Sequence, residues 1–156
     1  KLFIFSSSIL FLSFIVAWLL LKLPEMIIPE IYNAASIIII ISSVLLIISQ
    51  VNIRKDQIEK ALWLTGASLL FGLFFSLLQV LGWNELLDSN AAFRNILLPF
   101  SLVHFVHVSV GIILLISVFK KIRKYRVHSK ARNYAANVYL FWHFLGIIWL
   151  VFVGAG

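Results

Sequence analysis

The sequence contains no cysteine, and only 12% of its 156 residues are charged. Without a thiol there is no thiolate nucleophile, disulfide, iron–sulfur cluster or thiolate-bound copper. All six carboxylates lie outside the long apolar stretches, so none is placed to relay protons or bind a coupling cation within a membrane. The chain also has no glycine-rich phosphate loop and no zinc-protease helix motif. These absences exclude several catalytic chemistries.

The chain instead consists largely of apolar sequence of membrane-spanning length. Hydrophobic residues make up 62% of it, and the mean hydropathy is +1.06. A transmembrane helix needs roughly 20 predominantly apolar residues. Five stretches meet that length without an Asp, Glu, Lys or Arg: residues 2–21, 31–50, 61–83, 96–119 and 134–154. Because the connections are short, we predict an all-α integral membrane protein, a single domain over residues 1–156 built as a bundle of five transmembrane helices.

The net charge of +7 indicates membrane orientation rather than nucleic-acid binding. If the N-terminus faces the cytoplasm, eleven of the 13 basic residues lie inside, and the outer connections carry only Lys22 and Arg94. Cytoplasmic loops are enriched in Lys and Arg, so we expect a cytoplasmic N-terminus and an external C-terminus. The basic segment 120–133 is also suited to anionic lipid headgroups. The residues that we assign to such contacts, with ordinary solvated charge as the alternative, are Lys120, Lys121 and Arg123.

Three histidines inside the predicted spans are the main candidates for chemistry. His104 and His107 share a helix face, and His143 lies on the last span. The short connection makes these two spans antiparallel neighbours, which brings His143 within about one helical turn of the depth of His107. The histidines could clamp a b-type haem or hydrogen-bond between helices. Gln79 likewise needs a hydrogen-bond partner, whereas His128, in the basic segment, is expected to be solvated.

Small side chains recur at helical spacing in three of the spans. Ser68, Gly72 and Ser76 follow one another every four residues, and Gly111 and Gly146 lie on the histidine-bearing faces of the last two spans. Small residues allow two helices to approach closely. We therefore expect helix packing at these positions, within the chain or against a foreign subunit.

Two sequence motifs connect the chain with a known family. The sequence from His104 to Gly111 resembles the H-x-x-H-V-x-x-G helix of subunit III of haem–copper cytochrome oxidases. The sequence from Phe141 to Leu150 resembles that family's last helix, Y-W-H-F-x-D-x-x-W-L. Weaker likenesses in the other spans extend the resemblance over nearly the whole chain. It implies a five-helix form that lacks the first two helices of the seven-helix version.

The resemblance implies a non-catalytic subunit of an aerobic respiratory oxidase in the bacterial cytoplasmic membrane. Such a subunit packs on the catalytic subunit I and other oxidase subunits, with a respiratory supercomplex as a further assembly. It binds phospholipid, supports stability and oxygen or proton supply, and leaves haem and copper to its partners. One rival class is a b-type membrane cytochrome, with haem held by His107 or His104 together with His143. The other rival is a transporter or assembly factor.

Three positions depart from the family pattern. Ser7 stands where the family usually has a buried glutamate, Gly146 where it has an aspartate, and Phe105 where it commonly has glycine. Since the buried carboxylate is absent, a carboxylate-dependent proton role is in doubt for this chain.

Overall fold

The structure is a computed structural model, and it describes residues 7, 9–14, 16, 30–88, 91–125 and 129–154. Within these ranges all regular secondary structure is helical. The long helices are α2 (Glu30–Arg54), α3 (Ile58–Asp88), α4 (Ala91–Tyr125) and α5 (Ser129–Gly154). Most of the first expected span, the connection after it, and His128 lie outside the described residues.

Four of the five expected spans are confirmed as helices long and apolar enough to cross a membrane. Each helix continues beyond its apolar stretch, so the segments expected as connections are largely helical. Between α3 and α4, for example, only residues 89–90 separate the helices, and Pro99 lies inside α4. The flanking charges favour this extension, because Glu59 in the first turn of α3 and Arg54 in the last turn of α2 complement the helix dipoles.

The connection between α2 and α3 is a tight turn over residues 55–57. Asp56 has φ 58°, a left-handed conformation that Asp tolerates better than most residues. The Gln57 amide donates to the Asn52 carbonyl oxygen at 2.9 Å, and the Lys55 amide donates to the Val51 carbonyl oxygen at 3.1 Å. These bonds satisfy carbonyl groups that the end of α2 would otherwise leave unpaired.

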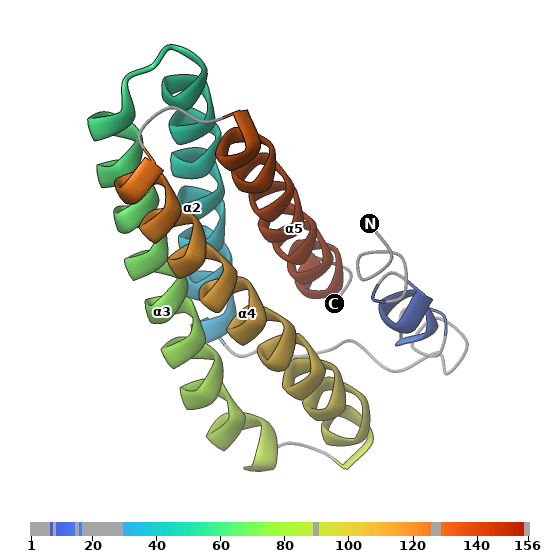
Figure 1. Ribbon diagram of the computed structural model, residues 1–156. Helices are drawn as coiled ribbons and strands as arrows, with labels where there is room; N and C mark the ends of the chain where they lie inside the picture. The colour runs from blue at the N-terminus through green and yellow to red at the C-terminus, as the bar shows by residue number, and fades with distance from the viewer. Residues whose placement is uncertain are drawn as a thin grey trace.

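The four helices form a closed ring in which α2 packs on α3, α3 on α4, α4 on α5, and α5 back on α2 (Figure 1). Aromatic side chains of α5 fill much of the interior, and three of them are almost inaccessible: Tyr139, Trp142 and Trp149. The outward faces carry aliphatic side chains that are more than half exposed, among them Ile37, Leu70, Val106, Ile113 and Ile147. An apolar surface this extensive suits hydrocarbon rather than water.

The described N-terminal residues are helical and pack against α4 through Phe11. The Phe11 ring is 1% exposed and lies 5.6 Å from the Phe100 ring and 5.2 Å from the His107 ring, measured between centroids. Phe14 contacts Phe100, whereas the earlier residue Phe11 also reaches His107, further along α4. This segment therefore runs antiparallel to α4.

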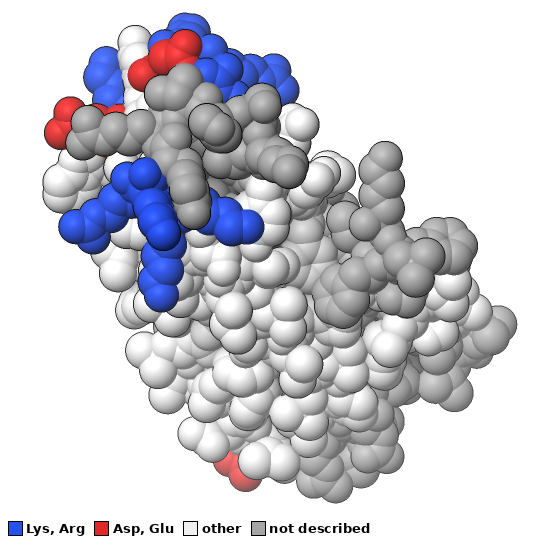
Figure 2. Space-filling view, viewed as in Figure 1, with Lys and Arg blue, Asp and Glu red and all other residues white. Residues whose placement is uncertain are grey.

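Lys and Arg side chains gather at one end of the bundle, where α2 turns into α3 and where α4 approaches α5 (Figure 2). The middle of the visible face carries no described charge. This separation of charge from the apolar middle is typical of a multi-pass membrane protein.

Candidate functional site

Polar side chains in the bundle interior meet one another across helices. Ser42 on α2 and Ser68 on α3 lie face to face, with 2.7 Å between their Oγ atoms. Each Oγ also lies 3.1 Å from the other residue's carbonyl oxygen. The Trp142 Nε1–H of α5 donates to Ser42 Oγ at 3.1 Å. Three helices are therefore joined by hydrogen bonds between buried side chains.

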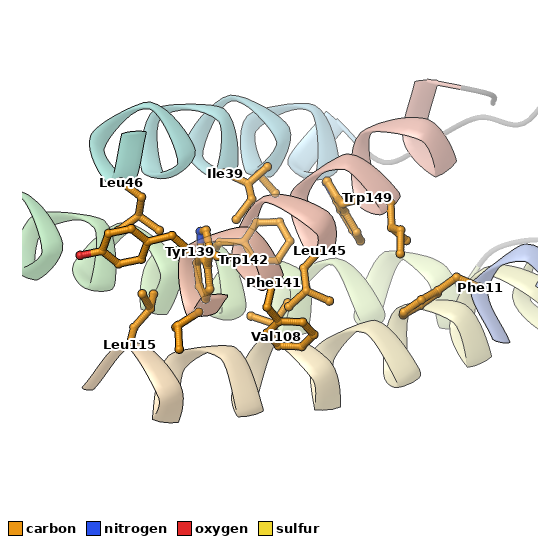
Figure 3. Close-up of a cluster of buried hydrophobic side chains, with 14 of the residues drawn as sticks. Phe11, Ile39, Leu46, Val108, Leu115, Tyr139, Phe141, Trp142, Leu145 and Trp149 are labelled. Atoms are coloured by element: carbon orange, nitrogen blue, oxygen red, sulfur yellow. The ribbon is translucent and has the colours of Figure 1, made fainter. Parts of the chain in front are cut away.

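Trp142, which belongs to the buried cluster shown in Figure 3, lies against two glycines that leave space for its indole ring. A Cβ on Gly72 of α3 would lie 2.6 Å from Trp142 Cη2, and a Cβ on Gly111 of α4 would lie 3.1 Å from Trp142 Cε3. The small residues at these positions thus accept the edge of an indole ring. Ser76 instead bonds within its own helix, to the Gly72 carbonyl oxygen at 3.1 Å, and a Cβ on Gly146 would make only ordinary contact with α2.

A second polar cluster lies nearer the basic end of the bundle. The Tyr139 hydroxyl of α5 lies 2.7 Å from Thr65 Oγ1 and 3.1 Å from Ser49 Oγ. Ser49 and Thr65 lie 2.9 Å from each other, and both donate to the Ala61 carbonyl oxygen. All of these groups are buried, so the cluster fixes α2, α3 and α5 relative to one another.

A third cluster joins α3 to α4 at the opposite end. Gln79 Nε2–H donates to the Ser101 carbonyl oxygen at 3.0 Å and to Ser101 Oγ at 3.1 Å. The Trp83 Nε1–H donates to the same hydroxyl at 2.8 Å. Gln79 is fully buried, and its Oε1 has no hydrogen-bond partner. Gln79 therefore has a partner for its NH₂ group but not for its carbonyl oxygen.

His104 is enclosed by aromatic rings. Its imidazole is fully buried and lies between Phe100, at 6.0 Å and nearly parallel, and Trp149, at 5.3 Å. Phe11 and Phe75 contact it edge-on at 5.9 and 6.0 Å. Neither ring nitrogen has a hydrogen-bond partner. An unpaired buried polar group costs about 1–3 kcal/mol, so the burial of His104 in this arrangement is unfavourable for folding.

The rings around His104 come from the N-terminal helical residues, from α3, from α4 itself and from α5. His107 Nδ1 lies 2.8 Å from the Val103 carbonyl oxygen, and His143 is half-buried with its Nε2 unpartnered.

The residues expected to contact lipid headgroups lie on the last turns of α4. Lys120, Lys121 and Arg123 are all exposed. Lys121 Nζ lies 3.5 Å from the centroid of the Tyr134 ring, a cation–π contact that links α4 to α5. Beside it, Arg132 forms an ion pair with Asp56 of the α2–α3 turn. The surface thus combines free positive charge with contacts that hold the helix ends together.

Sequence reasoning did not find the partners of the tryptophans. Trp142 binds Ser42, and Trp149 Nε1–H donates to Ser36 Oγ at 3.1 Å. The available signal was the spacing of Ser36, Ser42 and Ser49 along α2, which puts small hydroxyl groups at intervals of roughly two helical turns.

Comparison with known proteins supports the family that the histidine motifs indicate. No family model matches the chain. The chain is 29% identical over 133 residues to cytochrome bo(3) ubiquinol oxidase subunit 3 of Buchnera aphidicola subsp. Acyrthosiphon pisum (strain APS). It is similar to an oxidase subunit III. The match covers 78% of this chain and 64% of the relative's length.

Proposed function

We propose that this chain is a non-catalytic subunit III of an aerobic respiratory haem–copper oxidase. The observation that carries the proposal is the similarity over 133 residues to a protein named as subunit 3 of a ubiquinol oxidase. The two histidine motifs agree with it. The relative's name makes a quinol the first electron donor to test for the partner complex.

The polar chemistry of the bundle supports a structural role. Serine, threonine, tyrosine and tryptophan side chains bind one another between helices, as at Ser42 and Trp142. No group of three or more metal-ligating side chains occurs among the described residues. In this proposal haem and copper belong to partner subunits, and the chain packs against the catalytic subunit I.

The basic end of the bundle faces the cytoplasm in this proposal. Eleven of the 13 basic residues belong to that side, and positive charge is retained on the cytoplasmic side of membrane proteins. The exposed residues Lys120, Lys121 and Arg123 then meet anionic phospholipid headgroups. The aliphatic outer faces contact acyl chains, where oxygen dissolves readily. Support of stability and oxygen supply therefore suits this chain better than a proton role based on a carboxylate.

Co-purification tests the proposal. The full chain, tagged and extracted in mild detergent, is expected to bring polypeptides that contain haem and copper. When isolated from them it should show no b-type α-band in a reduced-minus-oxidised spectrum. A haem band in the isolated chain would favour the rival cytochrome, and purification without any redox subunit would contradict the assembly role.

Single histidine variants separate the structural role from ligation. Replacing His104, His107 or His143 by Leu is expected to weaken assembly or endurance during turnover and to leave the haem spectrum of the complex unchanged. Loss of a haem signal from His143→Leu alone would contradict the proposal. Replacing the basic-segment His128 by Leu serves as the control.

A further inference from the structure

Among the buried side-chain atoms without a hydrogen-bond partner are Gln79 Oε1 on α3, both ring nitrogens of His104 on α4, and Ser7 Oγ in the N-terminal helical residues. Their side chains are 0%, 0% and 3% exposed. Nothing in the helix packing described above uses these atoms.

The contacts place Gln79 and His104 about one helical turn apart. Phe75 contacts His104, and Gln79 binds Ser101. Gln79 follows Phe75 by four residues, whereas Ser101 precedes His104 by three, as expected for antiparallel helices. One turn corresponds to an offset of about 5.4 Å along the helix axes. It is close to the span of two successive bonds of about 2.8 Å through one water molecule.

Rotating the Gln79 side-chain amide by 180° would not give its Oε1 a hydrogen-bond donor. Its Nε2 donates to the Ser101 carbonyl oxygen, which can only accept a hydrogen bond. Reversing the amide would set two acceptor oxygens against each other. Gln79 Oε1 therefore remains an acceptor without a hydrogen-bond donor among the described residues.

Ser7 lies about one helical turn before Phe11, whose ring contacts His104. Phe14 contacts Phe100, whereas Phe11 contacts His104 and His107. The N-terminal residues thus run antiparallel to α4, and Ser7 precedes Phe11 on the side toward His107. A neutral imidazole has one donor and one acceptor nitrogen at different edges of the ring, so it can form one hydrogen bond on each side.

We propose that His104 is the centre of a buried water site, in which water bridges its imidazole to Gln79 Oε1 on one side and to Ser7 Oγ on the other. Buried waters typically join polar groups that the protein itself leaves unpaired. The proposal does not depend on the oxidase assignment.

Solid-state NMR of the full chain in lipid bilayers, with ¹⁵N-labelled histidine and tryptophan, tests this directly. We expect magnetisation transfer from water protons to a ring nitrogen of His104. The Trp142 Nε1, which is buried and bonded to Ser42, should receive none. Spectra of His107→Phe, His128→Gln and His143→Phe assign the His104 signals by subtraction, without altering His104. The proposal would be overturned if the His104 ring nitrogens had the ¹⁵N chemical shifts of an imidazole without hydrogen bonds and received no magnetisation from water. A direct hydrogen bond between Gln79 and His104 would also overturn it.

A thermal denaturation cycle provides an independent check. His104→Phe and Gln79→Met should each lower Tm, and the double variant should lose clearly less than the sum, because both changes empty the same water site. His104→Phe combined with Ser49→Ala is the matched control. Ser49 binds Thr65, ten residues from Phe75 along α3, so those losses should add. Additive losses in both pairs would count against the water site.

Discussion

Replacing Gly72 by alanine should destabilise the bundle by forcing a methyl group into the Trp142 ring. The new Cβ would lie 2.6 Å from Cη2 and 2.8 Å from Cζ2 of that indole. The ring cannot easily withdraw, because Gly111 contacts its other edge and Ser42 holds its Nε1–H. Overpacking of this kind costs about 1–3 kcal/mol.

Gly66→Ala is the matched control in the same helix. A Cβ there would meet Phe119 Cε2 at 3.5 Å, which is ordinary van der Waals contact. Both variants gain the same helix propensity, about 0.5–1 kcal/mol for alanine over glycine. The difference between Gly72→Ala and Gly66→Ala therefore isolates the collision, and it should be about 1–3 kcal/mol.

Equilibrium unfolding in mixed detergent micelles measures this difference. A second comparison in a Trp142→Phe background sharpens it, because phenylalanine lacks the atoms nearest Gly72. The gap between the two alanine variants should shrink there, although the background itself loses the bond to Ser42. If Gly72→Ala and Gly66→Ala were equally stable in the natural background, the predicted collision with the Trp142 ring would be refuted.

Three further predictions concern the polar contacts. Tyr139→Phe should cost about 1 kcal/mol in the same unfolding assay, because it removes the hydroxyl that meets Ser49 and Thr65; Tyr134→Phe, which keeps the ring face used by Lys121, should not. Arg132→Ala should change stability by less than about 0.5 kcal/mol, since its ion pair is solvent-exposed, and a larger loss would contradict that. Binding to anionic vesicles should weaken, and its salt dependence should fall, on changing three residues to glutamine: Lys120, Lys121 and Arg123. If vesicle binding were unchanged, these three residues would not contribute to lipid binding.

The four described spans could be predicted from the sequence because membrane helices need long runs without charge, and this chain places every charge outside such runs. The helix ends could not be predicted from hydropathy. Segments such as residues 120–125 are polar yet compatible with a helix. Hydropathy indicates where the chain leaves the hydrocarbon core of the membrane, but it does not indicate where the helix ends. Proline is common near the start of a helix, so Pro99 gives no sign that α4 begins earlier, at Ala91.

The candidate site was predictable only in part, for a related reason. Helical spacing indicates which residues share a face, so the small residues Ser68 and Gly72 could be assigned to packing. Spacing does not indicate which helix they face. Gly72 meets Trp142 of α5, although α3 packs along α2 and α4. Long aromatic side chains cross the centre of a four-helix ring, and their partners depend on the whole packing arrangement.

The same geometry explains why a chain with so little reactive chemistry carries recognisable histidine motifs. The last residue of the first motif, Gly111, contacts Trp142 of the second, and His104 of the first contacts Trp149 of the second. The motif residues therefore form one interlocked contact between α4 and α5 rather than two separate sites. A motif of this kind specifies how two helices pack, and it can persist in a chain that lacks the family's buried carboxylates. The resemblance therefore concerns how α4 and α5 pack, and the proposed role in an oxidase is tested by co-purification.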